Sequence, residues 1–380
     1  MSCFKKGVSL SAALLAGALL LTACGGAPAS SASSVPASSV ASSEAAEQPE
    51  EPAMKYTQTP TVPTETYKEE ADFADFLSKA EPGLVIPGLA ENLIPQGMDQ
   101  CDETGILYIS GYYTTDGKSS AILAVDTATG ELTAEYILLN AGGTPFDGHV
   151  GGVAVSEDTL YVSGQKQNGL YTICAIPLKD LPAEGSHEVK LEQTIPVPVS
   201  PSFLSDSHGY LWVGNFYHPG ADYPLSDGMK YTTASADGED YGCYIMGYDL
   251  SKGSLSVADG DDYAQPDVVL VGPNKIQGVV AGEDDTVTLS QSYGRKNNAS
   301  LLRYSLALGE TLDTMLTVQG RDVPGYILDS KRLKESVTAM PMTEALADAK
   351  DGGIYVLFES GAIHYANGTF RTDHVWKIKF

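Results

Sequence analysis

The chain has 380 residues, among them 49 Asp or Glu against 23 Lys or Arg, which gives a formal net charge of -26 at pH 7. Such an acidic protein repels nucleic acid and anionic membrane surfaces, so we exclude both as charge-driven partners. Its 39 glycines, and 21 tyrosines against 9 phenylalanines, are typical of many short strands joined by turns.

The N-terminus has the pattern of an export signal. Lys5 and Lys6 precede an apolar run, Val8–Leu21, that is too short to cross a bilayer, so residues 1–23 are a predicted signal peptide. The following letters, LTAC ending at Cys24, resemble the lipobox of bacterial lipoproteins. The resemblance implies cleavage before Cys24, acylation of its sulfur with chains such as palmitate, and anchoring on the extracytoplasmic side of the cell membrane. An ordinary secretory signal with a chance cysteine is the alternative.

Two segments separate the signal from the main domain. Residues 24–66 are rich in Ser, Ala, Pro and Glu, and such a segment buries too little surface to offset the entropy of ordering it. We therefore expect a disordered tether. Residues 67–83 place Phe73 and Phe76 at helical spacing, which predicts a short docking helix. The remaining residues, 84–380, are expected to form one domain.

Five hairpins of similar pattern divide this domain. Each has an apolar strand, a turn rich in Asp, Glu, Ser and Gly, and a second strand, and they lie at 95–113, 149–165, 201–217, 276–294 and 341–361. A third strand follows each hairpin, and the first four lead to a fourth strand, which we place at 187–197 in the second repeat. Repeats of four antiparallel strands are typical of a β-propeller, whose sheets, or blades, stack around an axis.

The predicted fold is all-β, a single β-propeller with five blades; six are the alternative if the long third or fourth repeat hides one. A two-sheet sandwich is the rival architecture. The last repeat lacks a fourth strand, and we expect Leu84–Leu89 to supply it, so that N- and C-terminal strands close the ring without an open edge. Cys101, Cys174 and Cys243 lack metal-binding spacing and are expected to be free thiols.

In a propeller, first strands start and second strands end on the same face, where the central channel opens as a mouth. Polar side chains recur at these positions. First-strand starts carry Gln96, His149, Ser202, Gln277 and Glu344. Second-strand ends carry Ser110, Asn215, Ser290 and Glu359, followed by Tyr112, Tyr217 and Tyr293. Converging polar groups with aromatic walls predict a small-ligand pocket. A channel that only holds ordered water is the alternative.

His149 is the most suggestive single residue, because flanking glycines permit close approach of a ligand or a backbone. With Glu344 and Glu359 it is suited to general acid–base chemistry, so these three are the candidate catalytic residues. A purely structural histidine is the alternative. No motif of serine hydrolases, zinc proteases or phosphate-binding loops occurs, and the sequence favours a binding protein over an enzyme.

Two long segments are expected to overhang the mouth. Residues 217–242 are a predicted lid, and residues 320–340 together with Arg295 place basic residues there, which favours an anionic ligand; a solvated surface is the alternative. We expect no cofactor and no metal. Channel Ca²⁺ is a weak alternative, since the acidic turns at 237–240 and 259–262 lack the spacing of a calcium loop.

The repeated hairpins, with PQG at 95–97, HVGG at 149–152 and LWVG at 211–214, resemble bacterial extracytoplasmic propellers of the gluconolactonase-like and YVTN-repeat-like kinds. The resemblance covers about Leu84 to Phe380 and implies the fold. Gluconolactonases have an acid–glycine pair on the first inner strand, where the acid binds a divalent metal. Here Gln96 occupies that place, so we extend the fold and not the activity to this chain.

Together these features predict a monomeric, lipid-anchored protein that binds a small polar ligand at the axial mouth. A carbohydrate or an anionic component of the cell envelope is the expected ligand. The first alternative is a hydrolase or lyase that uses His149 with Glu344 or Glu359. The second alternative is a scaffold for protein–protein interaction.

Overall fold

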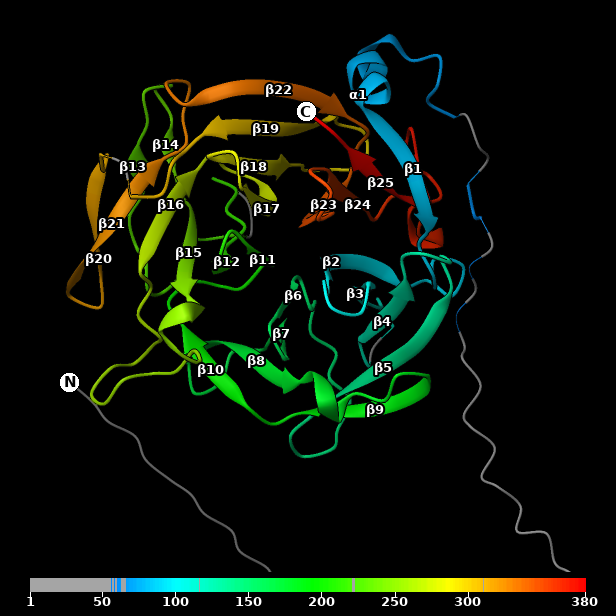
Figure 1. Cartoon of the computed structure of the whole chain (residues 1–380), viewed down its shortest axis with the longest axis horizontal. Coiled ribbons are helices and arrows are strands. Elements are labelled where there is room, and N and C mark those ends of the chain that lie inside the picture. Colours follow the sequence, from blue (N-terminus) through cyan, green and yellow to red (C-terminus); the bar gives the residue numbers. More distant parts are fainter. Residues whose placement is uncertain are drawn as a thin grey trace, which may run out of the picture. The chain divides into compact units, whose positions relative to one another are not determined.

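The computed structural model describes residues 56, 58, 60–62, 66–115, 117–220, 223–309 and 311–380. Five sheets of four or more strands stand around a common axis, which confirms the predicted five-bladed β-propeller (Figure 1). The predicted signal peptide and Cys24 lie outside the described residues. Within the described ranges, no helix is long and apolar enough to cross a membrane.

The four inner strands of each blade are antiparallel and follow one another outward from the axis. The first strands are β2 (Ile94–Gln100), β6 (Val153–Ser156), β11 (Phe203–Ser207), β17 (Ile276–Gly282) and β23 (Thr343–Asp348). The second strands are β3 (Ile106–Tyr112), β7 (Thr159–Ser163), β12 (Tyr210–Gly214), β18 (Thr286–Gln291) and β24 (Ile354–Phe358). The third strands are β4 (Ala121–Asp126), β8 (Tyr171–Pro177), β15 (Cys243–Asp249), β19 (Ala299–Ser305) and β25 (His374–Ile378). The fourth strands are β5 (Leu132–Asn140), β10 (Thr194–Val197), β16 (Val268–Gly272), β22 (Leu333–Ala339) and β1 (Ala80–Val85).

The two ends of the domain meet in one blade, which confirms the predicted closure. β1 pairs antiparallel with β25, so that the sheet runs β1–β25–β24–β23. The closing strand lies earlier in the chain than the predicted Leu84–Leu89, because it begins at Ala80 and ends at Val85. Ile86 and Leu89, which follow it, are buried in the core. The pairing removes an open edge that would otherwise be free to bind a second chain.

A short helical segment, η1 (Ala71–Phe73) and α1 (Ala74–Lys79), leads directly into β1. Phe73 and Phe76 are fully buried and contact Phe370 and Trp376 edge-on or tilted. The helix therefore docks through the two aromatic residues that define its apolar side.

Part of the expected tether is described and contacts the propeller. The backbone N–H groups of Thr61 and Val62 donate to the carboxylate of Asp373 at 2.6 and 2.9 Å. The side chain of Gln58 accepts from the N–H of Leu132 at 2.9 Å. These contacts connect the end of the segment 24–66 with blades one and five.

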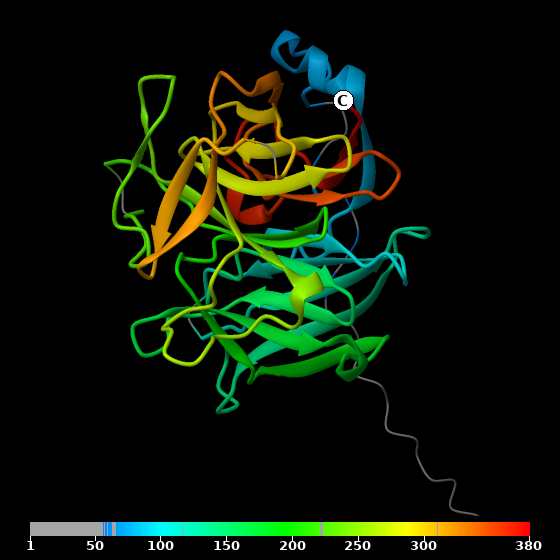
Figure 2. The same cartoon turned by 60° about the vertical axis from the view of Figure 1, so that its left-hand side comes forward.

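Two blades carry strands beyond the fourth. β9 (Gly185–Leu191) lies parallel to β5 on blade one, and the hairpin β20 (Thr314–Val318)–β21 (Arg321–Ile327) joins blade three, with β21 parallel to β16. The prediction of one strand at 187–197 was wrong, since only β10 pairs within blade two. The long fourth repeat thus adds its hairpin β20–β21 to the outer side of blade three and forms no blade of its own (Figure 2). The described residues therefore contain five blades and no sixth.

Glycines bring neighbouring first strands into backbone contact. A Cβ atom on Gly152 would lie 2.2 Å from the nitrogen of Leu204, and one on Gly97 would lie 2.6 Å from the nitrogen of Val153. A Cβ on Gly278 would similarly approach the backbone of blade five. No side chain fits at these distances, so glycine is required for the axis to pack.

An apolar cluster fills each space between neighbouring blades. Trp212 is fully buried between blades three and four, where it contributes one of the largest side chains of the core. Burial at about 25 cal/mol per Å² of apolar surface is the main stabilising contribution. Cys101, Cys174 and Cys243 are buried in these clusters and free, as predicted.

Candidate functional site

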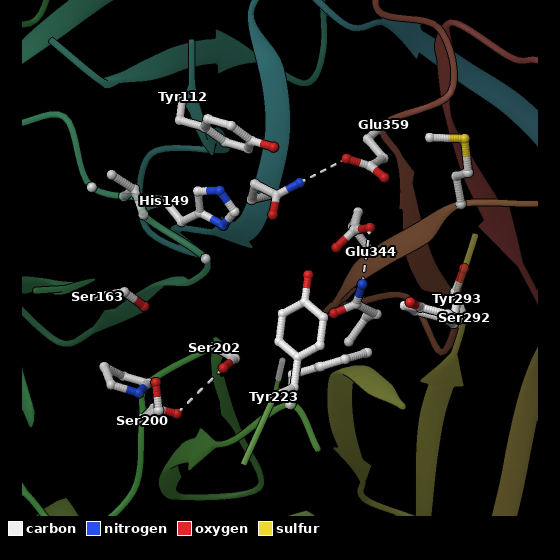
Figure 3. Close-up of a pocket in the computed structure, with 18 of the residues that line it drawn as sticks. Tyr112, His149, Ser163, Ser200, Ser202, Tyr223, Ser292, Tyr293, Glu344 and Glu359 are labelled. Carbon is white, nitrogen blue, oxygen red and sulfur yellow. Dashed lines mark hydrogen bonds between the residues drawn. The ribbon is translucent and has the colours of Figure 1, made fainter. Parts of the chain in front are cut away.

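A cavity of about 540 Å³, which we call the axial pocket, opens on the face where the first strands begin. Most of the predicted ligand residues line it: Gln96, Tyr112, His149, Ser202, Gln277, Tyr293, Arg295, Glu344 and Glu359. In Figure 3, Tyr112 and His149 stand on one side, and Glu344 and Glu359 lie across from them. Residues from distant repeats are thus brought together at the axis.

Three polar residues of the pocket project from irregularities in the first strands. The pairing of β2 with β3 is interrupted at Gln96, and that of β17 with β18 is interrupted at Gln277. In β23 the interruption falls at Glu344 and Ala345. A β-bulge leaves a residue unpaired and turns its side chain, which here directs the amides and the carboxyl to the mouth.

Two amides hold two carboxyl groups at the pocket floor. Nε2 of Gln96 donates to Oε2 of Glu359 at 3.0 Å, and Nε2 of Gln277 donates to Oε1 of Glu344 at 3.1 Å. The side chains of Glu344 and Glu359, which we call the carboxyl pair, lie close enough for the charge of Glu359 to act on Glu344. The two amide bonds connect blade one with blade five and blade four with blade five.

Burial changes the protonation of the carboxyl pair. Glu344 is 4% exposed, and desolvation together with the charge of Glu359 raises its pKa well above the ordinary value. Desolvation likewise raises the pKa of Glu359 to about 7, against the opposing effects of the neighbouring Tyr365 and of the hydrogen bond from Gln96. Two buried carboxyl groups beside each other resist ionising together, so the pair retains a proton near neutral pH.

Tyr365 and Tyr112 connect the carboxyl pair with His149. Tyr365 lies beside Glu359 and beside Tyr112, whose pKa burial raises to about 12. The ring of Tyr112 stacks on His149, with ring centroids 4.0 Å apart and 27° between the planes. Desolvation lowers the pKa of His149, so its imidazole is neutral at pH 7 and forms an aromatic wall with Tyr112.

The opposite wall consists of Phe216, Tyr223 and Tyr293. Phe216 meets Tyr223 edge-on at 4.8 Å and lies 6.3 Å from Tyr293, measured between ring centroids. Tyr223 belongs to the segment 217–242, which contains the small strands β13 (Thr233–Ala234) and β14 (Asp240–Tyr241).

The segment 217–242 is fastened to the propeller. Lys166 and Asp227 form an ion pair between blade two and this segment. The N–H of Gly228 donates to the carbonyl of Pro198 at 3.0 Å. These contacts hold Asp227 and Gly228 of the segment against the propeller.

Four predicted ligand residues lie outside the axial pocket. Ser110 and Ser290 are fully buried: Oγ of Ser110 donates to the carbonyl of Val150, and Oγ of Ser290 donates to the carbonyl of Glu344. Asn215 is also buried and binds backbone groups. Tyr217 lines neighbouring hollows. The short side chains are used within the fold, where they join first and second strands to adjacent segments.

Tyr365, Tyr223 and Phe216 are pocket residues that the sequence did not single out. Tyr365 ends η4 (Ile363–Tyr365), between the second and third strands of blade five, and Tyr223 lies in the corresponding connection of blade three. Such connections open on the mouth of a propeller. Aromatic residues in the connections between second and third strands were therefore the sequence signal that could have identified these pocket residues.

The prediction that residues 320–340 overhang the mouth was wrong. This segment forms β21 and β22 at the outer edges of blades three and four, because the β20–β21 hairpin joins β16. Arg321 pairs there with Asp261 at 2.7 Å. Arg295, in contrast, lines the pocket, and its guanidinium lies 4.7 Å from the ring centroid of Tyr365.

The acidic turns that were considered for Ca²⁺ use their carboxylates within the protein. Asp261 binds Arg321, and Asp237 accepts from the N–H of Ser330 at 3.1 Å. In the part of the chain that the structure describes, no three His, Cys, Asp or Glu side chains form a group suited to a metal ion. The carboxyl pair supplies two acidic groups, both engaged by amides.

No protein-family description matches the chain, and no curated protein matches it. Among solved structures it is similar to the PQQ-bound form of an aldose sugar dehydrogenase from Streptomyces coelicolor, with 14% identity over 79% of this chain and 97% of that one, and a TM-score of 0.43. A glucose dehydrogenase shows 10% identity over 79% and 99%, with a TM-score of 0.39. A GH43 β-xylosidase/α-arabinofuranosidase from a compost metagenome shows 12% identity over 79% and 94%, also with a TM-score of 0.39. Similarity at this level concerns the arrangement of strands and not the chemistry of a site.

Proposed function

We propose that this protein binds a small polyhydroxylated ligand, a carbohydrate, in the axial pocket, and that a lipid on Cys24 anchors it outside the cell membrane. The floor of the pocket carries the proposal, because two amides and the carboxyl pair lie together there. A carboxyl pair that retains a proton offers acceptors and a donor, the amide of Gln277 also offers both, and Gln96, whose N–H groups bind Pro95 and Glu359, offers an acceptor. Neighbouring hydroxyl groups of a sugar ring need this combination.

The walls of the pocket support the same ligand class. The stacked rings of Tyr112 and His149 present an apolar face on one side, and Tyr293, which is 41% exposed, presents another. A sugar ring has C–H groups on its faces and hydroxyl groups at its edge, so it fits between aromatic walls above a polar floor. The volume of about 540 Å³ is within the ordinary range for pockets that bind small ligands.

A hydrolase or lyase that uses His149 with Glu344 or Glu359 is the second candidate, favoured by the raised pKa values of the carboxyl pair. Each carboxyl group is already held by an amide, Glu359 by Gln96 and Glu344 by Gln277, which supports a role in binding.

The lipid anchor is a separate part of the proposal and has its own test. Cells that express the full chain are grown with an alkyne analogue of palmitate, and the protein is isolated. We expect label on the wild-type protein and none on the Cys24→Ser variant. Equal labelling of both proteins, or labelling of neither, would overturn the anchor and leave the pocket unaffected.

The binding proposal is tested by thermal unfolding of the mature chain with Cys24→Ser, in the presence of sugars, sugar acids and organic acids. A ligand at 100 times its Kd stabilises the folded state by about 2.7 kcal/mol, which is readily seen as a raised Tm. We expect a sugar to raise the Tm of the wild type, and we expect Gln277→Leu to remove that shift. If no sugar shifts the Tm, or if the shift survives Gln277→Leu, the proposal fails.

A further inference from the structure

A second surface continues outward from the axial pocket over blades three and four. We call it the outer platform and define it by Tyr217, His218, Lys275 and Tyr293. One hollow of about 540 Å³ is lined by Tyr217, His218 and Lys275, and another of about 420 Å³ by Tyr217, His218 and Tyr223. Tyr223 lines both the axial pocket and the second hollow, and Tyr293 of the axial pocket contacts His218, which lines both outer hollows.

Aromatic rings follow one another along this surface. His218 meets Tyr293 edge-on, with ring centroids 4.3 Å apart, and Tyr293 lies beside Phe216. Tyr223 and Tyr293 are 45% and 41% exposed, and both rings lie beside Phe216. Polar side chains accompany them, since Asn274 and Gln291 line the same hollow as Lys275.

The outer platform is held in place by backbone contacts. The ring of Tyr217 lies against Gly242, where a Cβ atom would come within 2.3 Å of it. The N–H of Lys275 donates to the carbonyl of Tyr217 at 2.9 Å, and Oδ1 of Asn274 accepts from the N–H of Gly242 at 2.9 Å. Lys275 itself has a φ of 71°, a left-handed conformation that non-glycine residues rarely adopt.

The axial pocket, in contrast, ends at its floor. The first strands of neighbouring blades are in backbone contact at Gly97, Gly152 and Gly278, directly beside the residues that line the pocket. A chain-like ligand therefore enters from the mouth by one end and leaves the pocket over the platform. Aromatic and polar groups continue from the axial pocket onto the outer platform at the rim beside Tyr293.

We infer that the axial pocket binds the end of an oligosaccharide chain, and that the next sugar units lie on the outer platform against Tyr293 and Tyr217. The inference rests on the proposed carbohydrate binding and extends it from a single sugar to a chain with a free end. The exposed ring of Tyr293 and the half-buried ring of Tyr217 pack against successive sugar faces, while Lys275 and Gln291 supply polar contacts at their edges.

The test measures affinity by isothermal titration calorimetry for two ladders of defined length. One ladder consists of N-acetylglucosamine, chitobiose and chitotetraose, and the other of glucose, maltose and maltotetraose. In the ladder whose monosaccharide binds, we expect affinity to rise about two- to tenfold for each added unit that meets an aromatic ring. Cyclomaltohexaose, which has no chain end, is expected not to bind.

Two substitutions test whether the outer platform causes the increase in affinity with chain length. Tyr293→Ala and Tyr217→Ala should each reduce affinity for the tetrasaccharide at least threefold more than for the monosaccharide. Tyr231→Ala is the matched control, because Tyr231 is 39% exposed in the same segment and contacts Thr317 on the outer side of blade three. It should leave both affinities unchanged.

The outcomes separate this inference from the proposed function. If monosaccharide and tetrasaccharide bind equally well, or if the cyclic sugar binds as tightly as the linear one, the inference is overturned and sugar binding in the pocket stands. If a length-dependent gain survives both tyrosine substitutions, the platform is not its source and the inference is likewise overturned. If no member of either ladder binds, both the inference and the proposed function fail.

Discussion

Gln96 and Glu359 lie 263 residues apart in the chain, yet Nε2 of Gln96 donates to the carboxyl of Glu359 at 3.0 Å. The contact joins blade one to blade five, the two blades that meet where the ring closes. It also places an amide donor and a protonated carboxyl pair side by side at the pocket floor. Formation of the candidate site therefore depends on closure of the propeller.

The first prediction concerns this contact. Gln96→Leu preserves volume but removes the donor to Glu359, and an unsatisfied buried polar group costs about 1 to 3 kcal/mol. We expect sugar affinity to fall at least tenfold, measured by calorimetry, with a decrease of similar size in the free energy of unfolding. Gln193→Leu, at an exposed position between β9 and β10, is the control and should change neither quantity. Unchanged affinity in Gln96→Leu would argue against the floor as the binding site.

The second prediction concerns pH. Burial raises the pKa of Glu359 to about 7 and that of Glu344 as well, whereas both titrate near 4.3 in an unfolded chain. Between these values the folded state holds protons that the unfolded state has lost. The contribution to stability is thus complete below about pH 4.3 and is lost as the pH rises through about 7, with a slope of at most about 1.4 kcal/mol per pH unit for each proton.

Urea unfolding between pH 4.5 and 8.5 measures this slope. The double variant Glu344→Gln, Glu359→Gln removes the titrating pair, so its free energy of unfolding should fall less steeply with pH than that of the wild type. Asp99, whose pKa burial raises to about 8, adds a slope of the same sign to both proteins, and the difference between them is the relevant quantity. Parallel curves would mean that the carboxyl pair is not protonated in the folded state.

The third prediction distinguishes two roles of His149, that of an aromatic wall of the pocket and that of a catalytic group. His149→Phe keeps an aromatic ring against Tyr112, whereas His149→Ala removes it. If His149 serves as a wall, affinity for the sugar stays within about threefold in His149→Phe and falls about tenfold in His149→Ala. A loss as large in the phenylalanine variant as in the alanine variant would show that the imidazole nitrogens are needed.

The fourth prediction concerns the packing of the axis. Gly152→Ala places a Cβ atom 2.2 Å from the nitrogen of Leu204, so two first strands must separate. We expect a loss of about 3 kcal/mol or more in the free energy of unfolding. Gly142→Ala is the control, because an added Cβ there meets nothing within 4 Å, and it should stay within about 0.5 kcal/mol of the wild type. Equal stability of both variants would contradict the close approach of the blades.

The repeats of the propeller were predictable because each hairpin combines strand residues with turn residues at short range. The extra strands were not. β9 pairs with β5 in parallel, and β21 pairs with β16 in the same way, so neither is joined to its partner by a turn that the sequence reveals. Their places depend on which outer edge is free once the blades have assembled.

The candidate site was predictable in position and less so in detail. Ser290 and Glu359 were both predicted to contact ligand from second-strand ends. Ser290 lies within β18, where its hydroxyl is taken by the carbonyl of Glu344 at 2.6 Å, whereas Glu359 follows the last residue of β24 and lines the pocket. Tyr365 was missed because its place depends on the path of a connection, which local pattern does not determine.

The most direct test is a crystal structure of the mature chain with a sugar that raises its Tm. The central claim predicts density for a sugar ring between Tyr112 and Tyr293, with hydroxyl groups within hydrogen-bond distance of Gln96, Glu344 and Gln277. Density for the sugar on another surface, with only water above the carboxyl pair, would contradict it.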